Sequence, residues 1–230
     1  MKYTTIFFDA YQTLMDFEDA EHQALERTFA EYHLSLNEEI HQLYQQINQS
    51  LWNAFEKNLI QKQQLLRERF GQLFQKLHIE NIDPSVFNHH YLYNLGFGSK
   101  TLPGAVEVCR KLYNMGLKLY ILTNGVSKTQ RRRLSASGLL PYVQDVFVSE
   151  EAGFQKPLKG YFDYVFARIP DFDAGKTLMV GDSLTSDILG ANQAGLDSCW
   201  FNPQKKPRPQ SPHIDFEISS LEEILQCIAD

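Results

Sequence analysis

Cysteine is scarce in this chain of 230 residues, and its few cysteines lie far apart. Cys109, Cys199 and Cys227 are odd in number and lack the paired spacing of zinc ligands. Small secreted domains held by disulfides need many more cysteines than this. The sequence therefore argues against a disulfide framework and a zinc site, and it predicts buried, inert thiols in a protein of the reducing cytoplasm.

Long apolar runs and an excess of basic residues are also missing. No segment approaches the roughly 18 apolar residues of a membrane-spanning helix, and the first apolar strand begins too early for a cleaved signal. The net charge of −6 and the pI near 5.7 argue against a broad surface for nucleic acid or membrane. The local basic clusters, Arg131-Arg132-Arg133 and Lys205-Lys206, are predicted to be solvated faces. We expect a small-molecule ligand, and a monomer or homodimer.

Proline almost disappears between Phe17 and Leu95, where Pro84 is the only one. Apolar residues recur in this block every three or four positions, the spacing of one helix face. They include Ala24, Leu25, Thr28 and Phe29, then Ile40, Leu43, Tyr44 and Ile47, then Leu66, Phe70, Leu73, Phe74 and Leu77. The block is predicted to be a helical bundle.

After Pro103-Gly104 short apolar runs alternate with helical stretches, which is the pattern of a parallel sheet. The predicted strands are Thr5–Asp9, Lys118–Thr123, Asp145–Ser149, Thr177–Gly181, Ser198–Phe201 and Phe216–Ile218. Because the first strand precedes the helical block, that block is an insertion. The predicted fold is therefore α/β: a Rossmann-like, doubly wound parallel sheet core (residues 1–15 and 99–230) with an inserted helical-bundle cap (residues 16–98).

Polar residues follow several of these strands, where ligands gather in open α/β sheets. They are Asp9 and Thr13, then Thr123-Asn124-Gly125, Lys156, and finally Gly181-Asp182 with Asp187. Phosphoryl transfer needs a nucleophile, hydrogen-bond donors, a cation and carboxylates for a metal, and each has a candidate here. Each segment alone is also an ordinary turn or surface dipeptide. Their combination in this order favours a catalytic site.

Residues 6–14, Ile-Phe-Phe-Asp-Ala-Tyr-Gln-Thr-Leu, resemble the nucleophile motif of the haloacid dehalogenase (HAD) superfamily. Five further segments are similar to the YjjG/YfnB-type subfamily: residues 48–52, 122–127, 148–157, 180–183 and 194–202. The resemblance implies a HAD phosphatase with a helical cap. It also implies a nucleotidase that acts on nucleoside 5′-monophosphates.

The resemblance also implies residue roles. Asp9 would be the nucleophile and an Mg²⁺ ligand, and the remaining ligands would be the Tyr11 carbonyl, Asp182 and, directly or through water, Asp187. Thr123 and the amide of Asn124, next to Gly125, would hold the phosphoryl oxygens. Lys156 would balance charge between Asp9 and the phosphate. Mg²⁺ suits such oxygen ligands.

Tyr11 departs from the Asp-x-Asp-x-Thr pattern of HAD phosphatases, whose second Asp is the general acid and base. Four interpretations remain open. The chain is a metal-dependent phosphatase with weakened acid–base catalysis, a metal-independent 2-haloacid dehalogenase, a catalytically impaired binding protein, or a chain in which Tyr11 is engineered or erroneous. Dehalogenases carry Tyr at this position. The acidic pair Asp182 and Asp187 argues against them, because an unneutralised carboxylate beside the nucleophile is unfavourable.

Aromatic residues on the predicted cap helix are candidates for contact with the leaving group. Trp52 and Phe55 lie one helical turn apart, and an aromatic plane would suit a nucleobase. The same spacing is typical of bundle core. Trp52 is therefore predicted as a substrate-binding residue, with core packing as the alternative.

Overall fold

The computed structural model describes residues 2–229, and the chain divides into two compact units. The α/β unit comprises Met1–Phe17 and Ser99–Asp230, and the helical unit comprises Glu18–Gly98. The first boundary lies two residues beyond the predicted one. Asp16 stays with the α/β unit through an ion pair with Lys100 (2.9 Å), and Phe17 through ring contact with Tyr11 (centroids 4.5 Å apart).

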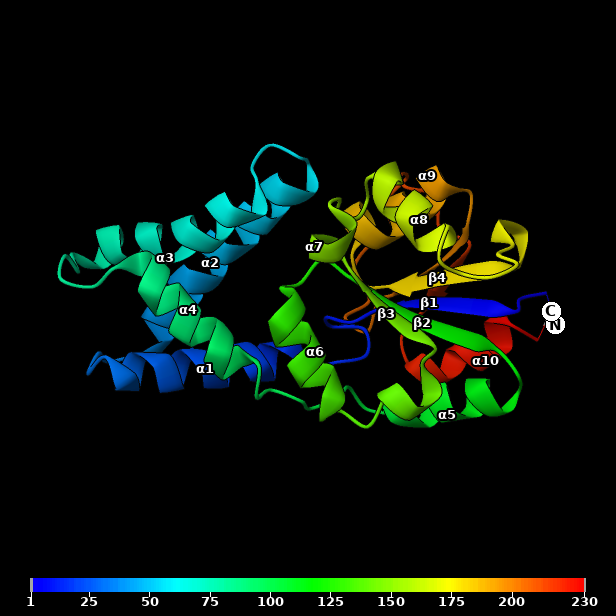
Figure 1. The fold of residues 1–230 in the computed structure, drawn as a ribbon, viewed down its shortest axis with the longest axis horizontal. Helices are drawn as coiled ribbons and strands as arrows, with labels where there is room; N and C mark the ends of the chain where they lie inside the picture. The colour runs from blue at the N-terminus through cyan, green and yellow to red at the C-terminus, as the bar shows by residue number, and fades with distance from the viewer. Residues whose placement is uncertain (1, 230) are drawn as a thin grey trace. The chain divides into compact units, whose positions relative to one another are not determined.

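The α/β unit is built on one six-stranded sheet (Figure 1). Its strands are β1 (Thr5–Asp9), β2 (Lys118–Thr123), β3 (Asp145–Val148), β4 (Thr177–Gly181), β5 (Asp197–Phe201) and β6 (Phe216–Ile218). All pairs are parallel, in the order β3-β2-β1-β4-β5-β6. The prediction of this Rossmann-like sheet is confirmed, with β3 ending and β5 beginning one residue earlier than expected. Strand order reverses between β1 and β4, where such folds bind ligands.

Helices cover both faces of the sheet, which is why its strands are apolar on both sides. One face packs on α5 (Ala105–Asn114), α6 (Ser127–Ser135) and α10 (Ile224–Cys227), and the other on α8 (Lys159–Phe166) and α9 (Leu189–Ala194). Alternate residues of β1 divide between the two cores, since Ile6 and Phe8 join one and Phe7 the other. The sheet is thereby rigid, and its strand ends are fixed supports for side chains.

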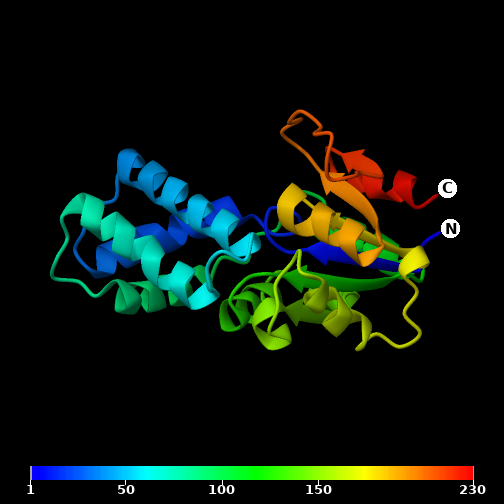
Figure 2. The same ribbon diagram turned by 90° about the horizontal axis from the view of Figure 1, so that it is seen from above.

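The helical unit contains four helices, drawn from blue to green in Figures 1 and 2: α1 (Phe17–Glu31), α2 (Glu38–Glu56), α3 (Lys62–Leu77) and α4 (Pro84–Leu95). Asn37 and Asp83 cap α2 and α4 by accepting backbone N–H bonds with their side chains. The bundle core is rich in aromatic rings, among them Phe29, Tyr44, Phe70, Phe74, Phe87 and Tyr91.

Polar side chains are also buried among these helices. Asn48 donates to Glu21 (3.1 Å), and Arg69 donates from Nε to Asn88 (2.7 Å) while its guanidinium lies over the ring of Tyr91 (4.6 Å). Burial raises the pKa of Glu21 to about 7, against the opposing effect of the positive charge of Arg69. The bundle therefore buries one carboxyl group, that of Glu21, and one guanidinium group, that of Arg69.

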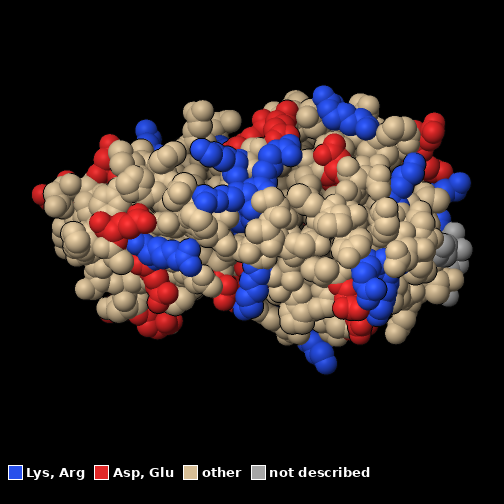
Figure 3. Space-filling model, turned by 60° about the horizontal axis from the view of Figure 1, so that its bottom comes forward, with Lys and Arg blue, Asp and Glu red and all other residues tan. Residues whose placement is uncertain are grey.

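Within residues 2–229, no helix combines the length and the hydropathy needed to cross a bilayer. On the face shown in Figure 3, Lys and Arg side chains are interspersed with Asp and Glu.

Candidate active site

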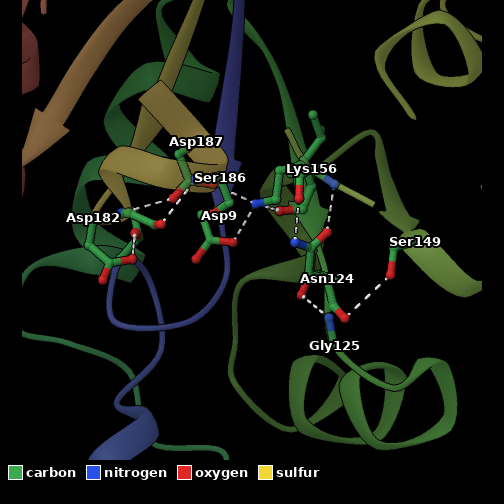
Figure 4. A network of polar contacts seen from close by, with 12 residues as sticks. Asp9, Asn124, Gly125, Ser149, Lys156, Asp182, Ser186 and Asp187 are labelled. Carbon is green, nitrogen blue, oxygen red and sulfur yellow. Dashed lines mark hydrogen bonds and ion pairs between the residues drawn. The ribbon is translucent and has the colours of Figure 1, made fainter. Parts of the chain in front are cut away.

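Three carboxylates meet at the point where the strand order reverses. Asp9 is the last residue of β1, Asp182 follows β4, and Asp187 lies one turn further on. Each offers one oxygen within 4.8 Å of the other two (Figure 4). The sequence predicted this meeting, because the carboxyl ends of parallel strands share one edge of the sheet.

Lys156 forms hydrogen bonds with two of these carboxylates, those of Asp9 and Asp187. Its Nζ donates to Asp9 Oδ1 (2.6 Å), to Asp187 Oδ1 (2.7 Å) and to the carbonyl of Leu122 (2.7 Å). Only 1% of its side chain is exposed. Burial disfavours the ammonium charge, but the carboxylates of Asp187 and Asp9 outweigh it and raise the pKa of Lys156. The lysine therefore stays charged, with all three N–H donors used.

One ammonium does not balance three carboxylates. Burial, together with the charge of Asp187, raises the pKa of Asp9 to about 7 in spite of Lys156. Burial and repulsion by Asp9 and Asp187 raise the pKa of Asp182 well above its usual range. The site holds more carboxyl groups than its one ammonium can neutralise, and a bound cation would favour their ionised forms.

Both carboxylate oxygens of Asp187 accept hydrogen bonds from other groups of the protein. Its Oδ1 accepts from Lys156, and its Oδ2 accepts from the backbone N–H of Ser183 (3.1 Å). A side chain at Gly181 would collide with this carboxylate, since a Cβ there would lie 2.3 Å from Asp187 Oδ2. The close approach explains the glycine in the Gly-Asp-x-x-x-x-Asp segment. Asp182 has a looser contact, accepting from Thr13 Oγ1 at 3.3 Å.

A π-helix, Leu184–Ile188, carries Asp187 back toward β4. The sequence predicted an ordinary helical stretch here. The wider turn is closed by the N–H of Ile188 donating to the Ser183 carbonyl (3.1 Å), and Ser183 Oγ caps it by accepting from the N–H of Ser186 (3.2 Å). Such π turns occur frequently at functional sites.

The loop after β2 presents hydrogen-bond donors. Thr123 Oγ1 accepts from the N–H of Gly125 (3.1 Å) and from Nε2 of Gln130 (2.5 Å). A hydroxyl has two lone pairs and one hydrogen, so these bonds leave the hydrogen for donation. Gly125 also permits close packing, because a Cβ there would lie 2.6 Å from the side chain of Gln130.

Asn124 links this loop to the lysine. Its side-chain Oδ1 accepts from the Lys156 N–H (2.9 Å), and its Nδ2 donates to the Lys156 carbonyl (3.0 Å). Ser149 Oγ donates to the Asn124 carbonyl (3.3 Å) (Figure 4). The side chain of Asn124 therefore holds the backbone from which Lys156 reaches Asp9, a contact that the sequence did not predict.

Arg133 corrects one prediction. The cluster Arg131-Arg132-Arg133 was expected to be solvated, but Arg133 is 0% exposed. Its guanidinium lies 5.1 Å from the ring centre of Tyr11 and 5.8 Å from that of Phe17, and it donates to the Asp16 carbonyl (3.4 Å). The prediction was wrong for this residue because α6 turns one face inward, so that only two of the three arginines reach solvent.

Trp52 is the predicted site residue that lies in the helical unit. It is half-buried on α2, and its ring meets that of buried Phe55 edge to face (5.7 Å). Its contact with substrate stays a prediction.

Sequence reasoning missed Gln130, Arg133, Ser149 and Trp200, which support the predicted residues. Their only sequence signal was position: two lie on the helix after Thr123-Asn124-Gly125, one directly follows β3 and one lies in β5. Nothing in that pattern shows that a polar group turns inward.

Known proteins resemble the chain over nearly its full length. The family model of haloacid dehalogenase-like hydrolases matches residues 3–195. YfnB of Bacillus subtilis, named as a HAD-hydrolase, is 43% identical over 97% of this chain and 94% of its own. Two proteins named pyrimidine 5′-nucleotidase follow: PynA of Streptococcus pneumoniae (36% identity; 99% and 96% coverage) and YjjG of Escherichia coli (35%; 99% and 99%).

Solved structures agree on the fold. The crystal structure of YfnB bound to magnesium superposes with a TM-score of 0.94 at 41% identity, covering 100% of both chains. A dehalogenase with an intermediate complex superposes with a TM-score of 0.77 over 100% of this chain and 98% of its own. At 20% identity, that second likeness concerns the fold alone.

Proposed function

Because the chain belongs to the haloacid dehalogenase-like hydrolases, we propose that it is a magnesium-dependent phosphatase of small phosphomonoesters, with nucleoside 5′-monophosphates as its main substrates. The observation that carries the proposal is the cluster of three carboxylates at the strand-order reversal, two of which bind Lys156. Its excess of carboxyl groups over ammonium groups and its oxygen ligands fit a hard divalent cation.

The ligand set follows from which oxygens are engaged. Asp9 and Asp182 would hold Mg²⁺ together with the Tyr11 carbonyl, as in the family. Asp187, whose two oxygens accept from Lys156 and Ser183, would take part through water. When bound, Mg²⁺ would screen the repulsion between the Asp9 carboxylate and a phosphate dianion.

Side chains and backbone groups of the protein would carry out the transfer of the phosphoryl group. An Asp9 oxygen attacks phosphorus, forming an aspartyl-phosphate while the bond to the ester oxygen breaks. Lys156 holds Asp9 in place, and the Thr123 hydroxyl and the Asn124 N–H donate to phosphoryl oxygens. Water then attacks phosphorus and releases inorganic phosphate, which restores the Asp9 carboxylate. Such preorganised donors stabilise charge where it develops.

Tyr11 would weaken proton transfer in both half-reactions. The departing ester oxygen needs a proton, and the attacking water must lose one. A phenol can donate a proton, but with an ordinary pKa near 10 it is a poor base at neutral pH. Because a positioned acid or base contributes roughly 10² to 10⁴ in rate, we propose reduced rather than absent turnover.

Relatives aligned over nearly the whole chain support a nucleotide substrate, since PynA and YjjG are named as pyrimidine 5′-nucleotidases. The glyceraldehyde 3-phosphate phosphatase of Methanocaldococcus jannaschii aligns with only 55% of the chain. Trp52 would stack on the base. Such stacking contributes about 1 to 3 kcal/mol per base in other proteins.

A metal-independent 2-haloacid dehalogenase is the second candidate, and Tyr11 is the observation in its favour. The same nucleophile, Asp9, would then displace halide from carbon. Asp182 opposes this candidate, because a further carboxyl group beside the nucleophile is costly to ionise when no cation is bound.

Hydrolysis of 4-nitrophenyl phosphate tests the proposal. We expect turnover to require added Mg²⁺ and to disappear in excess chelator, and Asp182→Asn to lower both turnover and Mg²⁺ response. Asp163→Asn removes an exposed carboxylate that pairs with Lys159 and serves as the control. Full activity in chelator, or chloride release from 2-chloropropionate, would overturn the proposal in favour of the dehalogenase.

A further inference from the structure

Trp200 lies beside the carboxylate cluster without belonging to it. It is near the end of β5, in register with Gly181 of β4, and only 2% exposed. Its ring packs with Ile188 and Ile214, one of which ends the π-helix. Its Nε1–H donates to the backbone carbonyl of Asp182 at 3.0 Å. A buried indole N–H needs an acceptor, and here the acceptor belongs to a candidate cation ligand.

This bond completes a clamp on a single peptide group. The carbonyl of Asp182 and the N–H of Ser183 belong to the same planar unit. Trp200 binds its oxygen, and Asp187 Oδ2 binds its hydrogen (3.1 Å). On the other side, Asp182 is tied to Gly181, the last residue of β4. The backbone that carries the Asp182 side chain therefore cannot rotate without breaking one of these bonds.

We propose that Trp200 is a positioning residue for the cation site, which orients the Asp182–Ser183 peptide so that the Asp182 carboxylate faces Asp9. The inference rests on the proposed function, because it presumes that Asp182 binds a cation. Side chains that hold metal ligands from behind typically change metal affinity or activity 10- to 100-fold when they are altered. The bond that the Asp182 carboxylate accepts from Thr13 Oγ1 is long (3.3 Å), so the placement of this carboxylate depends strongly on its own backbone.

The test measures cation affinity directly. Mn²⁺ takes the same oxygen ligands as Mg²⁺, and electron paramagnetic resonance counts the free ion during a titration. We compare the unaltered protein with Trp200→Phe, and with a protein that carries 3-benzothienylalanine at position 200. The second variant keeps the bicyclic ring and loses only the N–H. We expect each to bind Mn²⁺ at least about tenfold more weakly.

Tyr3→Phe is the matched control. Tyr3 is also a buried aromatic residue with one hydrogen bond, to Asp197, at the opposite end of β5. Its loss should lower the melting temperature and leave Mn²⁺ affinity unchanged. If the benzothienyl protein binds Mn²⁺ as tightly as the unaltered one, the inference is wrong and Trp200 only fills the core.

A different result of the same titration would contradict the proposed function. If the unaltered protein and Asp182→Asn both bind no Mn²⁺, or bind it equally, there is no cation site for Trp200 to support. Both proposals are supported if the position 200 variants lose Mn²⁺ affinity about tenfold, Asp182→Asn loses more, and Tyr3→Phe loses none.

Discussion

The two units both bury charged side chains, but they balance the charges differently. In the helical unit one carboxylate, Glu21, lies in the field of one guanidinium, Arg69. In the α/β unit three carboxyl groups lie together, and only one ammonium, that of Lys156, binds two of them. A balanced pair can serve packing and helix register alone. An unbalanced cluster is stable only with a further cation or a raised pKa, and such imbalance is a mark of functional sites.

The difference teaches where to look for chemistry in a chain of this type. Burial of a charge is not the signal, because Arg133, Glu21 and Arg69 are as buried as Lys156. A functional site is indicated instead where buried carboxyl groups outnumber the cationic side chains beside them. Removing single charges from each unit therefore tests the comparison.

The largest effect is expected for Lys156→Met. The change leaves Asp9 and Asp187 buried without their shared partner, and breaking a buried pair in this way typically costs about 3 to 5 kcal/mol. Urea denaturation measures the free energy of unfolding. Mg²⁺ should restore part of the loss, because it supplies positive charge to the same carboxylates. Lys159→Met is the control, since its exposed pair with Asp163 contributes about 1 kcal/mol or less. A loss no larger than that of the control would contradict the buried network.

Glu21→Gln should change the pH dependence of stability in the helical unit. The pKa of Glu21 is raised to about 7 in the folded protein, so the folded state favours its protonated form. That contribution is fully present below the ordinary pKa and is lost as pH rises through 7, on the order of 3 kcal/mol. Glu21→Gln should remove this part of the decline between pH 5 and 8.

Denaturation followed by far-ultraviolet circular dichroism at several pH values measures the change. Glu39→Gln, on the exposed face of α2, is the matched control. If the free energy of unfolding depends on pH in the same way for Glu21→Gln and for the unaltered protein, the pKa of Glu21 is not raised and the prediction is wrong.

Tyr11→Asp should raise turnover of nucleoside monophosphates by roughly 10² or more, since it supplies the missing acid and base. Formation of the phosphoenzyme from an aryl phosphate should change little, because its phenolate leaving group departs as a stabilised anion. Arg133, 5.1 Å from the Tyr11 ring centre, would favour the ionised form of the new carboxylate.

Burst and steady-state rates must be measured separately, because dephosphorylation can limit both substrates. Tyr11→Asn has nearly the same shape without an acidic group and should show no gain. Equal rates for the Asp and Asn variants would mean that position 11 is not where the proton is transferred.

The smallest effect is expected for Trp52→Ala, about 1 to 3 kcal/mol of transition-state binding for nucleotides, by analogy with base stacking elsewhere. The ratio of kcat/KM values for a nucleoside monophosphate and an aryl phosphate measures it. Trp52→Phe keeps an aromatic plane and should lose less. An equal loss for both substrates, or a large fall in melting temperature, would assign Trp52 to the bundle core beside Phe55.

The sequence was sufficient to predict the sheet and the edge of the sheet that carries the candidate site. Strand periodicity is local, and the carboxyl ends of parallel strands must share an edge, so Asp9, Asp182 and Lys156 could be grouped before any contact was known. The order of the first strand and the helical block likewise predicted an insertion. These features depend on short-range patterns and on rules of chain connection.

Only the tertiary structure decided which polar groups turn inward to support that edge. Gln130 and Arg133 of α6 and Trp200 of β5 occupy unremarkable positions, and each finds its partner outside its own helix or strand. Such a polar group is buried only where packing provides a hydrogen-bond partner or an aromatic ring for it. A local sequence pattern does not show whether that partner is present. The sequence by itself therefore determined which carboxylates and which lysine meet at this end of the sheet, whereas long-range packing decided how firmly they are held.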